Sequence, residues 1–201
     1  MSGHPVWDIP TRVFHWLLVV AVICSWVSHE IDNIDMHLYS GYTVLVLVVF
    51  RLAWGFIGSV HSRFSDFIRG PGAVMAYWRG ATDSRPGHNP AGGWSVLLLL
   101  TLLLAQALSG LFNGDGLMFD GPLHHLLNGD WQDQVGELHE YLFWGVSTLV
   151  GIHVLAVLYY QFKRREDLIG PMFTGGSGGR EAARPPWFAP MILAVIIAAL
   201  V

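Results

Sequence analysis

The sequence predicts an all-α integral membrane protein built around a bundle of four transmembrane helices. Of the 201 residues, 53% are hydrophobic and 13% are charged, whereas soluble domains carry about 25% charged residues. Four apolar stretches are each close to the length of about 20 residues that a helix needs to cross a bilayer. Basic residues are also present on one set of connections and absent from those between them, as they are in proteins that cross a membrane several times.

The first three stretches cover residues 10–28, 36–57 and 94–112, and the fourth, 138–161, contains no Lys or Arg. A last apolar stretch lies in Pro185–Val201, and as a helix of about 15 residues it would reach only about 22 Å, short of a full span. It is either a short fifth helix or an interfacial tail. We expect a transmembrane domain over residues 6–174, followed over 175–201 by a Gly-rich linker and this apolar segment.

The basic residues predict the orientation. All 11 Lys and Arg lie in residues 1–12, 51–85 and 163–184, and none lies in the connections 29–35 and 113–136. Because Lys and Arg concentrate in cytoplasmic loops, we expect the N-terminus, the 58–93 connection and the residues after the fourth helix in the cytoplasm. The middle of the 58–93 connection should lie along the membrane interface. The predicted location is the bacterial cytoplasmic (inner) membrane, crossed several times.

Four histidines fall near the ends of the predicted helices. His139 and His153 are 14 residues apart in the fourth helix, so they project from nearly the same face about 21 Å apart along the axis. The predicted orientation places His37 at the outer level with His139, and His15 at the inner level with His153. The remaining histidines lie in connections, and His4, His61 and His88 are expected to be solvated.

Two facing imidazoles at each level fit a six-coordinate haem. Zinc would require three or four clustered ligands. Cys24 is the one cysteine, which excludes a disulfide framework, a CxxC pair and the CxxCH attachment of a c-type haem. Iron with both axial positions filled changes oxidation state and leaves no open site for substrate. We therefore expect a four-helix transmembrane haem-binding bundle with two non-covalent haem b groups, which form an electron path across the bilayer.

Arg51 and Gly41 are further candidates for haem contacts. Arg51 follows His37 by 14 residues, which repeats the spacing in the fourth helix and predicts the inner level. A buried arginine is costly without an anion, and a haem propionate would serve; alternatively Arg51 snorkels toward the headgroups. Gly41, one turn after His37, leaves space for a flat macrocycle, although small residues also let bare helices pack closely.

At these residues the chain resembles the bacterial di-haem membrane cytochromes b, often called cytochrome b561-type, which include the cytochrome b subunits of nickel–iron hydrogenases. The similarity covers about residues 6–174. It rests on W-D-I-P-T-R-V-F-H-W, H-L-Y-S-G-Y, F-R-L-A-W-G, R-F-S-D-F-I-R-G-P, L-H-E-Y and G-I-H-V-L-A-V-L-Y-Y. The resemblance implies that His15, His37, His139 and His153 are the axial ligands.

The resemblance also implies electron exchange between a redox partner and membrane quinone, as in a respiratory chain. The chain would be an electron-transfer subunit of a quinone-linked oxidoreductase, with a periplasmic hydrogenase or c-type cytochrome as its partner. Some relatives instead oxidise superoxide. The competing hypothesis is a structural anchor or haem-holding protein without turnover. Membrane lipid is the other expected partner, and no nucleic acid is expected.

The predicted outer connections are acidic and contain no Lys or Arg, so a basic redox protein is expected to dock there. Their carboxylates are Glu30, Asp32, Asp35, Asp115, Asp120, Asp130 and Asp133.

Overall fold

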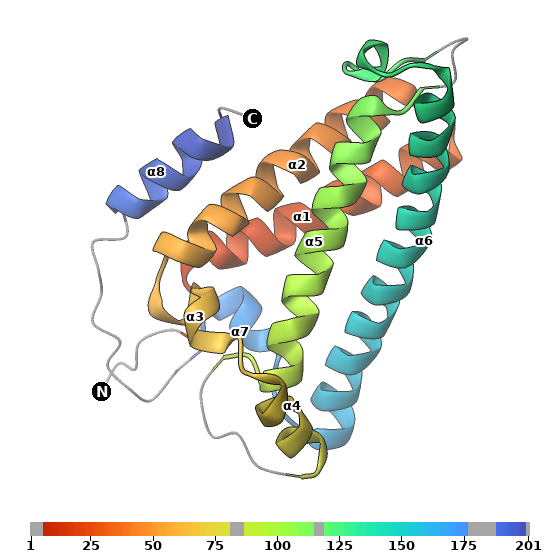
Figure 1. The fold of residues 1–201 in the computed structure, drawn as a ribbon. Helices are drawn as coiled ribbons and strands as arrows, with labels where there is room; N and C mark the ends of the chain where they lie inside the picture. Colours follow the sequence, from red (N-terminus) through yellow and green to blue (C-terminus); the bar gives the residue numbers. More distant parts are fainter. Residues whose placement is uncertain (1–5, 81–86, 115–118, 177–187, 200–201) are drawn as a thin grey trace.

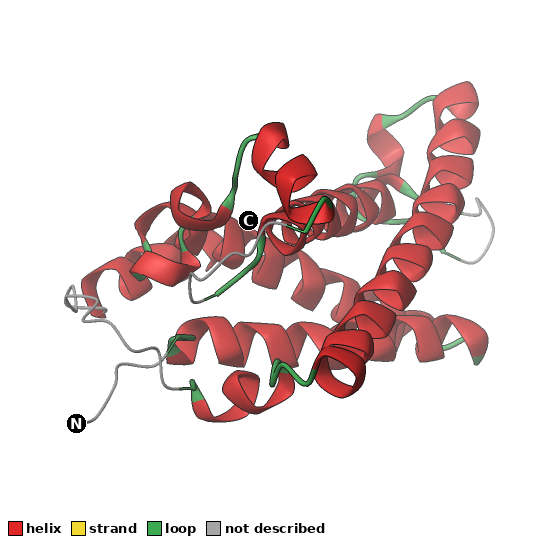
Figure 2. Ribbon diagram, turned by 90° about the horizontal axis from the view of Figure 1, so that it is seen from below, coloured by secondary structure: helices red, strands yellow, loops and turns green. Residues whose placement is uncertain are grey.

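The computed structural model describes residues 6–80, 87–114, 119–176 and 188–199. Within these ranges the chain consists of helices and connections, with one isolated bridge between Gly114 and Asp120 (Figure 2). The predicted all-α class is therefore confirmed. Four of the described helices are long and apolar enough to cross a membrane: α1 (Ile9–Glu30), α2 (Ile34–Ile57), α5 (Pro90–Phe112) and α6 (Gly129–Leu158).

Shorter helices fill the connections. They are η1 (Val60–Ser62), α3 (Phe64–Phe67), α4 (Pro71–Trp78), η2 (His124–Leu126), the π-helix η3 (Tyr159–Arg164) and α7 (Ile169–Thr174). The C-terminal α8 (Phe188–Ala199) confirms the short fifth helix that the sequence left open. It packs beside α2 and buries Ala194 and Ala198 (Figure 1). Its 12 residues reach about 18 Å, too short to span a bilayer.

Two helices begin earlier than the hydropathy pattern predicts. α5 starts at Pro90 instead of residue 94, because the Asn89 side chain accepts a hydrogen bond from the Gly92 amide at 2.7 Å and caps the helix. α6 starts at Gly129, nine residues before the predicted start at Leu138. Its first turns are polar, which resembles a loop in a hydropathy profile, but Asp130 in the first turn favours a helix N-terminus.

The four long helices are arranged as neighbours in the order α1, α2, α5 and α6. One end of the bundle, here called the basic end, holds the start of α1 and also α3, α4 and α7 (Figure 1). The other, the acidic end, holds the α1–α2 turn and the connection from α5 to α6. Among the predicted outer carboxylates, Asp115 lies outside the described residues. Of the four spans α6 is the least enclosed, with 6% of its most apolar stretch buried against 39% for α2.

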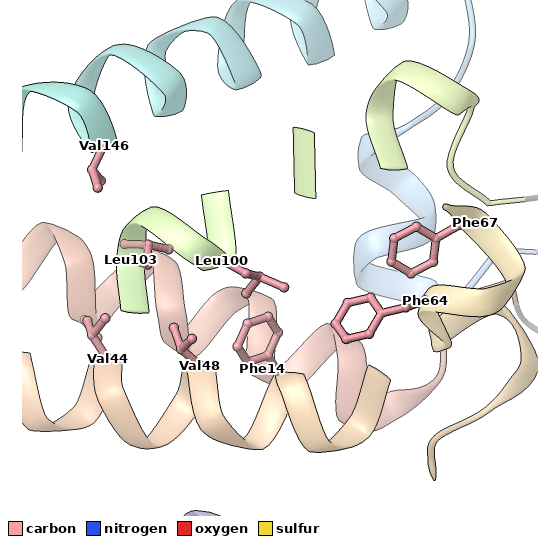
Figure 3. Packing of buried hydrophobic residues seen from close by; sticks show 9 residues of the cluster. Phe14, Val44, Val48, Phe64, Phe67, Leu100, Leu103 and Val146 are labelled. Atoms are coloured by element: carbon pink, nitrogen blue, oxygen red, sulfur yellow. The ribbon is translucent and has the colours of Figure 1, made fainter. Parts of the chain in front are cut away.

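A hydrophobic core joins the long helices and extends to the basic end (Figure 3). Val48 of α2 and Leu103 of α5 lie in its middle, and α3 adds Phe64 and Phe67. α3 can approach its neighbours because both present a glycine. A Cβ on Gly55 of α2 would lie 2.2 Å from the Phe64 ring, and one on Gly93 of α5 would lie 2.6 Å from the Phe67 carbonyl.

Asp8 ties the start of α1 to the end of α2. Its carboxylate accepts hydrogen bonds from the Thr11 amide at 2.8 Å, from Trp54 Nε1 at 3.0 Å and from the hydroxyls of Ser59 and Ser62. Burial alone raises the pKa of Asp8, but the hydrogen bonds from Ser59, Thr11 and Ser62 outweigh it and hold the pKa below the ordinary value of 3.8. The W-D-I-P-T segment is thus a structural joint at the basic end.

Replacing Asp8 with Ala should lower the free energy of unfolding by about 2 kcal/mol or more, because several buried donors lose their shared acceptor. Thermal unfolding of the purified protein in detergent measures this loss. The carboxylate stabilises fully above pH 3.8 and loses its effect as the pH falls through the lower folded-state pKa, so the difference between the two proteins should close there. Glu137→Ala, which removes an exposed carboxylate of α6, should change little; equal losses in both variants would contradict the prediction.

Candidate functional site

Near the acidic end, His37 of α2 and His139 of α6 face each other. Their ring centroids are 6.4 Å apart and their planes lie at 79°. A metal ion bound at about 2.0 Å by one nitrogen of each ring would separate the ring centres by about 6 Å. The spacing of this outer pair therefore fits a single ion held between two imidazoles.

The hydrogen bonds of His37 leave one of its nitrogens available as a ligand. Nδ1 lies 2.9 Å from the backbone carbonyl oxygen of Ser25 on α1. A carbonyl can only accept, so Nδ1 carries the proton and donates it. The neutral ring then has its lone pair on Nε2, which is the form that binds a metal.

His139 is oriented in the same way by α5. The Ser109 hydroxyl donates to the Gln106 carbonyl at 2.9 Å and lies 2.9 Å from His139 Nδ1, so its oxygen accepts the Nδ1 proton. The Gln106 amide lies 3.1 Å from Nε2. A Cβ on Gly110 would come within 3.1 Å of the His139 ring, so glycine permits this close approach.

Sequence reasoning did not identify Ser25, Ser109 or Gln106. Of the three, only Gln106 could have been noticed in the sequence, because it is a large polar residue in a mostly apolar predicted helix that contains no histidine. The two serines could not be distinguished from ordinary small packing residues, because their partners lie on other helices.

The inner pair, His15 of α1 and His153 of α6, lies toward the basic end. The structure brings His37 and His139 into ring contact, whereas no ring contact or hydrogen bond joins His15 to His153 among the described residues. His15 Nδ1 is buried without a hydrogen-bond partner among the described residues. α7 covers this side of α1, because Trp16 stacks on Phe173 at 4.5 Å and donates to a backbone carbonyl of α7 at 3.1 Å.

Arg51 lies at the same end, inside the bundle. Arg51 is only 2% exposed. Its guanidinium carbon is 5.3 Å from the centre of the Phe64 ring and 5.9 Å from the centre of the Phe67 ring. In this structure the side chain packs inward and does not extend toward the headgroups. Arg51 Nη1 has no hydrogen-bond partner in the described part of the chain.

Gly41 faces open space. A Cβ built there would meet nothing within 4 Å, so close packing of bare helices does not account for this glycine. The same is true of Gly151 on α6, whereas a Cβ on Gly145 would touch Leu102 at 3.7 Å. Gly41 and Gly151 thus leave room beside the helices that carry the histidine pairs.

His88 is the residue whose environment sequence reasoning judged wrongly. Its ring packs between Trp7 and Phe67, at 4.7 Å from each ring centre, and Nδ1 is buried without a partner among the described residues. Burial, and next the neighbouring charge of Arg51, lowers the pKa of His88 to about 3, so the ring is neutral. His61 pairs with Asp66 at 3.3 Å, and His4 lies outside the described residues.

These features fit haem b better than a zinc ion. No group of three or more His, Cys, Asp or Glu side chains in the described ranges could hold a metal, whereas a haem needs two axial imidazoles. In the same ranges, five buried side-chain atoms lack a hydrogen-bond partner. They are Arg12 Nε, His15 Nδ1, Arg51 Nη1, His88 Nδ1 and Gln106 Oε1.

The fold and the paired histidines define a class of protein, the multi-pass membrane cytochromes of the b type. A profile of the family described as prokaryotic cytochrome b561 matches residues 6–175, and the chain belongs to this family. It is accordingly a membrane protein that binds haem b and takes part in electron transfer.

Three relatives share the description "Probable Ni/Fe-hydrogenase B-type cytochrome subunit". The protein of Rhizobium leguminosarum bv. viciae is 20% identical over 85% of this chain and 87% of its own length. That of Bradyrhizobium diazoefficiens is 23% identical over 86% of each chain, and that of Azotobacter vinelandii is 22% identical over 85% and 86%. No solved structure gave a significant match.

Ser109→Ala should weaken haem binding at the outer pair about 10- to 100-fold, because the His139 ring loses the acceptor that sets its orientation and tautomer. Titration of haem into the apoprotein, followed by absorbance, measures the affinity. Thr101→Ala is the matched control, since Thr101 lies on the same helix and bonds back to the Leu97 carbonyl at 2.9 Å. Similar affinities for the Ser109 variant and the control would contradict the positioning role.

Proposed function

We propose that the chain carries electrons between a redox protein docked at the acidic end and quinone in the membrane. In this proposal His37 and His139 hold one haem b, and His15 and His153 hold a second. The observation that carries it is that α6 contributes one member of each pair, 14 residues apart. A single helix then fixes two redox centres about 21 Å apart along its axis.

The residues have separate tasks in this scheme. Haem b, when bound, supplies an iron centre that gains and loses one electron. The two imidazoles of each pair would hold the haem iron and would leave it no open position for substrate. Ser25 and Ser109 hold the outer imidazoles in the ligating tautomer, while Arg51 offsets the charge of a propionate at the inner site.

The orientation follows from the distribution of basic residues, which favours a cytoplasmic basic end in the bacterial inner membrane. The acidic end would then face the periplasm. The names of the three relatives support a hydrogenase as the redox partner. A basic c-type cytochrome would dock on the same acidic surface. The partner would not need to pack tightly against the acidic end, because attraction between opposite charges mainly accelerates the encounter of the two proteins.

Purified protein should contain two non-covalent b haems, counted by the pyridine haemochrome assay. His37→Ala and His139→Ala should each remove the same optical and EPR signal, because each deletes one ligand of the outer haem. His15→Ala and His153→Ala should each remove the other signal. One haem per chain, or a signal shared by His37 and His153, would contradict the two-level arrangement.

A quinol should reduce both haems of the purified protein within the time of a stopped-flow experiment. An anchor without turnover would hold haem but would not exchange electrons with quinol at a useful rate. Failure of quinol to reduce an otherwise intact, dithionite-reducible protein would therefore favour the anchor hypothesis.

Electron transfer with a basic redox protein should slow as ionic strength rises, because exposed charges are screened over about 10 Å at 0.1 M salt. Asp130 and Asp133 are exposed on the first turns of α6, and changing both to Asn should reduce the second-order rate at low salt. Glu166→Gln, at the basic end, is the control. A rate that is indifferent to salt and to the Asp130 and Asp133 changes would remove the acidic end from the docking site.

A further inference from the structure

Two polar side chains from distant parts of the sequence meet on one aromatic ring at the basic end. Arg51 of α2 lies over Phe67, with 5.9 Å from its guanidinium carbon to the ring centre. His88, just before α5, packs on Phe67 with 4.7 Å between ring centres. The charge of Arg51 acts on His88, and so do charges on His15 and His153. Arg51 and His88 therefore border the same region as the inner histidine pair.

The two side chains do not satisfy each other in this structure. A guanidinium has donors only, and a neutral imidazole has one N–H to give and one lone pair that can accept, but no hydrogen bond reaches Arg51 Nη1 or His88 Nδ1 from the described residues. Arg51 Nη1 and His88 Nδ1 are both buried without a partner among the described residues. With the His88 proton on Nδ1, both nitrogens are donors beside the same Phe67 ring, and an acceptor that bears negative charge would satisfy them.

The chain does not supply that acceptor from its described residues. Asp8 is near enough for its charge to act on Arg51, but its carboxylate already accepts from Thr11, Trp54, Ser59 and Ser62. The ion pairs of the described residues are His61–Asp66, His124–Asp120 and Arg164–Glu166, so Arg51 is in none of them. An external carboxylate would complete the site.

We propose that Arg51 and His88 together bind one propionate of the inner haem, with Arg51 Nη1 and His88 Nδ1 donating to its oxygens. This inference rests on the proposed function and adds a residue from the connection between α2 and α5 to the inner site. His88 is held in place by a second ring contact, with Trp7, and by the α5 cap at the adjacent Asn89. Its role is to position the propionate and to stabilise its charge by a hydrogen bond from a neutral ring, without touching the iron.

The test compares two porphyrins in the full-length protein. Apoprotein made in cells that cannot synthesise haem is reconstituted in detergent with haem b or with its dimethyl ester, whose propionates carry no charge. The variants are His88→Leu, His88→Gln, which keeps a donor, and His61→Gln, a control on the same side of the bundle. The reduction potential of the inner haem, identified as the signal missing in His153→Ala, is measured by spectroelectrochemical titration.

With haem b, His88→Leu should lower the equilibrium constant for reduction of the inner haem about tenfold, which is about 59 mV for a one-electron couple. The uncompensated propionate charge favours the oxidised iron. The outer haem and the His61→Gln protein should keep their potentials, and His88→Gln should recover most of the shift. With the dimethyl ester, His88→Leu and the unmodified protein should have the same inner potential.

An unchanged inner potential in His88→Leu would overturn the proposal, as would an equal shift with both porphyrins, since the effect would then not depend on a carboxylate. Either result would leave the two-haem function standing. Absence of the inner signal from the unmodified protein would instead overturn the two-haem function, and this site with it.

Discussion

Every polar nitrogen buried among membrane-spanning helices must find a partner, because lipid supplies no hydrogen bonds and an unsatisfied group costs free energy. This constraint explains where the chain places its polar side chains. His37 has Nδ1 bound by a neighbouring helix, so its Nε2 still requires a partner, whereas α5 binds both nitrogens of His139, Nδ1 through Ser109 and Nε2 through the Gln106 amide. Arg51, His88 and His15 each retain a buried nitrogen without a partner in the described part of the chain, and these three lie toward the basic end.

The two ends of the bundle therefore prepare their sites by different means. At the acidic end, backbone and hydroxyl groups of the long helices α1 and α5 orient the imidazoles directly. At the basic end, the surroundings come largely from connecting segments: α3 supplies Phe67, the residues before α5 supply His88, and α7 covers the side of α1 near His15. The joint at Asp8 holds the start of α1 against the end of α2 and against η1, the short helix just before α3.

The helical class and the four spans could be predicted, and a short fifth helix was one of two alternatives, because hydropathy and length depend on residues that are adjacent in the sequence. The start of α6 could not, because a polar helix outside the lipid has no hydropathy signal. Ser25 and Ser109 were not identifiable, since their roles depend on which helix lies opposite. His88 was expected to be solvated, and only the packing of Trp7 and Phe67 against it reveals a half-buried ring with an enclosed Nδ1. The ligand assignments themselves remain predictions.

The length of α6 has a mechanical consequence. Its 30 residues form a rod of about 45 Å, longer than the hydrocarbon layer of about 30 Å. Part of the extra length is the polar turns before Leu138, which would extend beyond the lipid. These turns belong to the same continuous helix, with no hinge between them and the apolar part. Asp133 and His139 are six residues apart on this rod, about 9 Å along the axis. A force applied by a protein pressing on the exposed turns would thus reach the imidazole through continuous helix, with no flexible loop to absorb it.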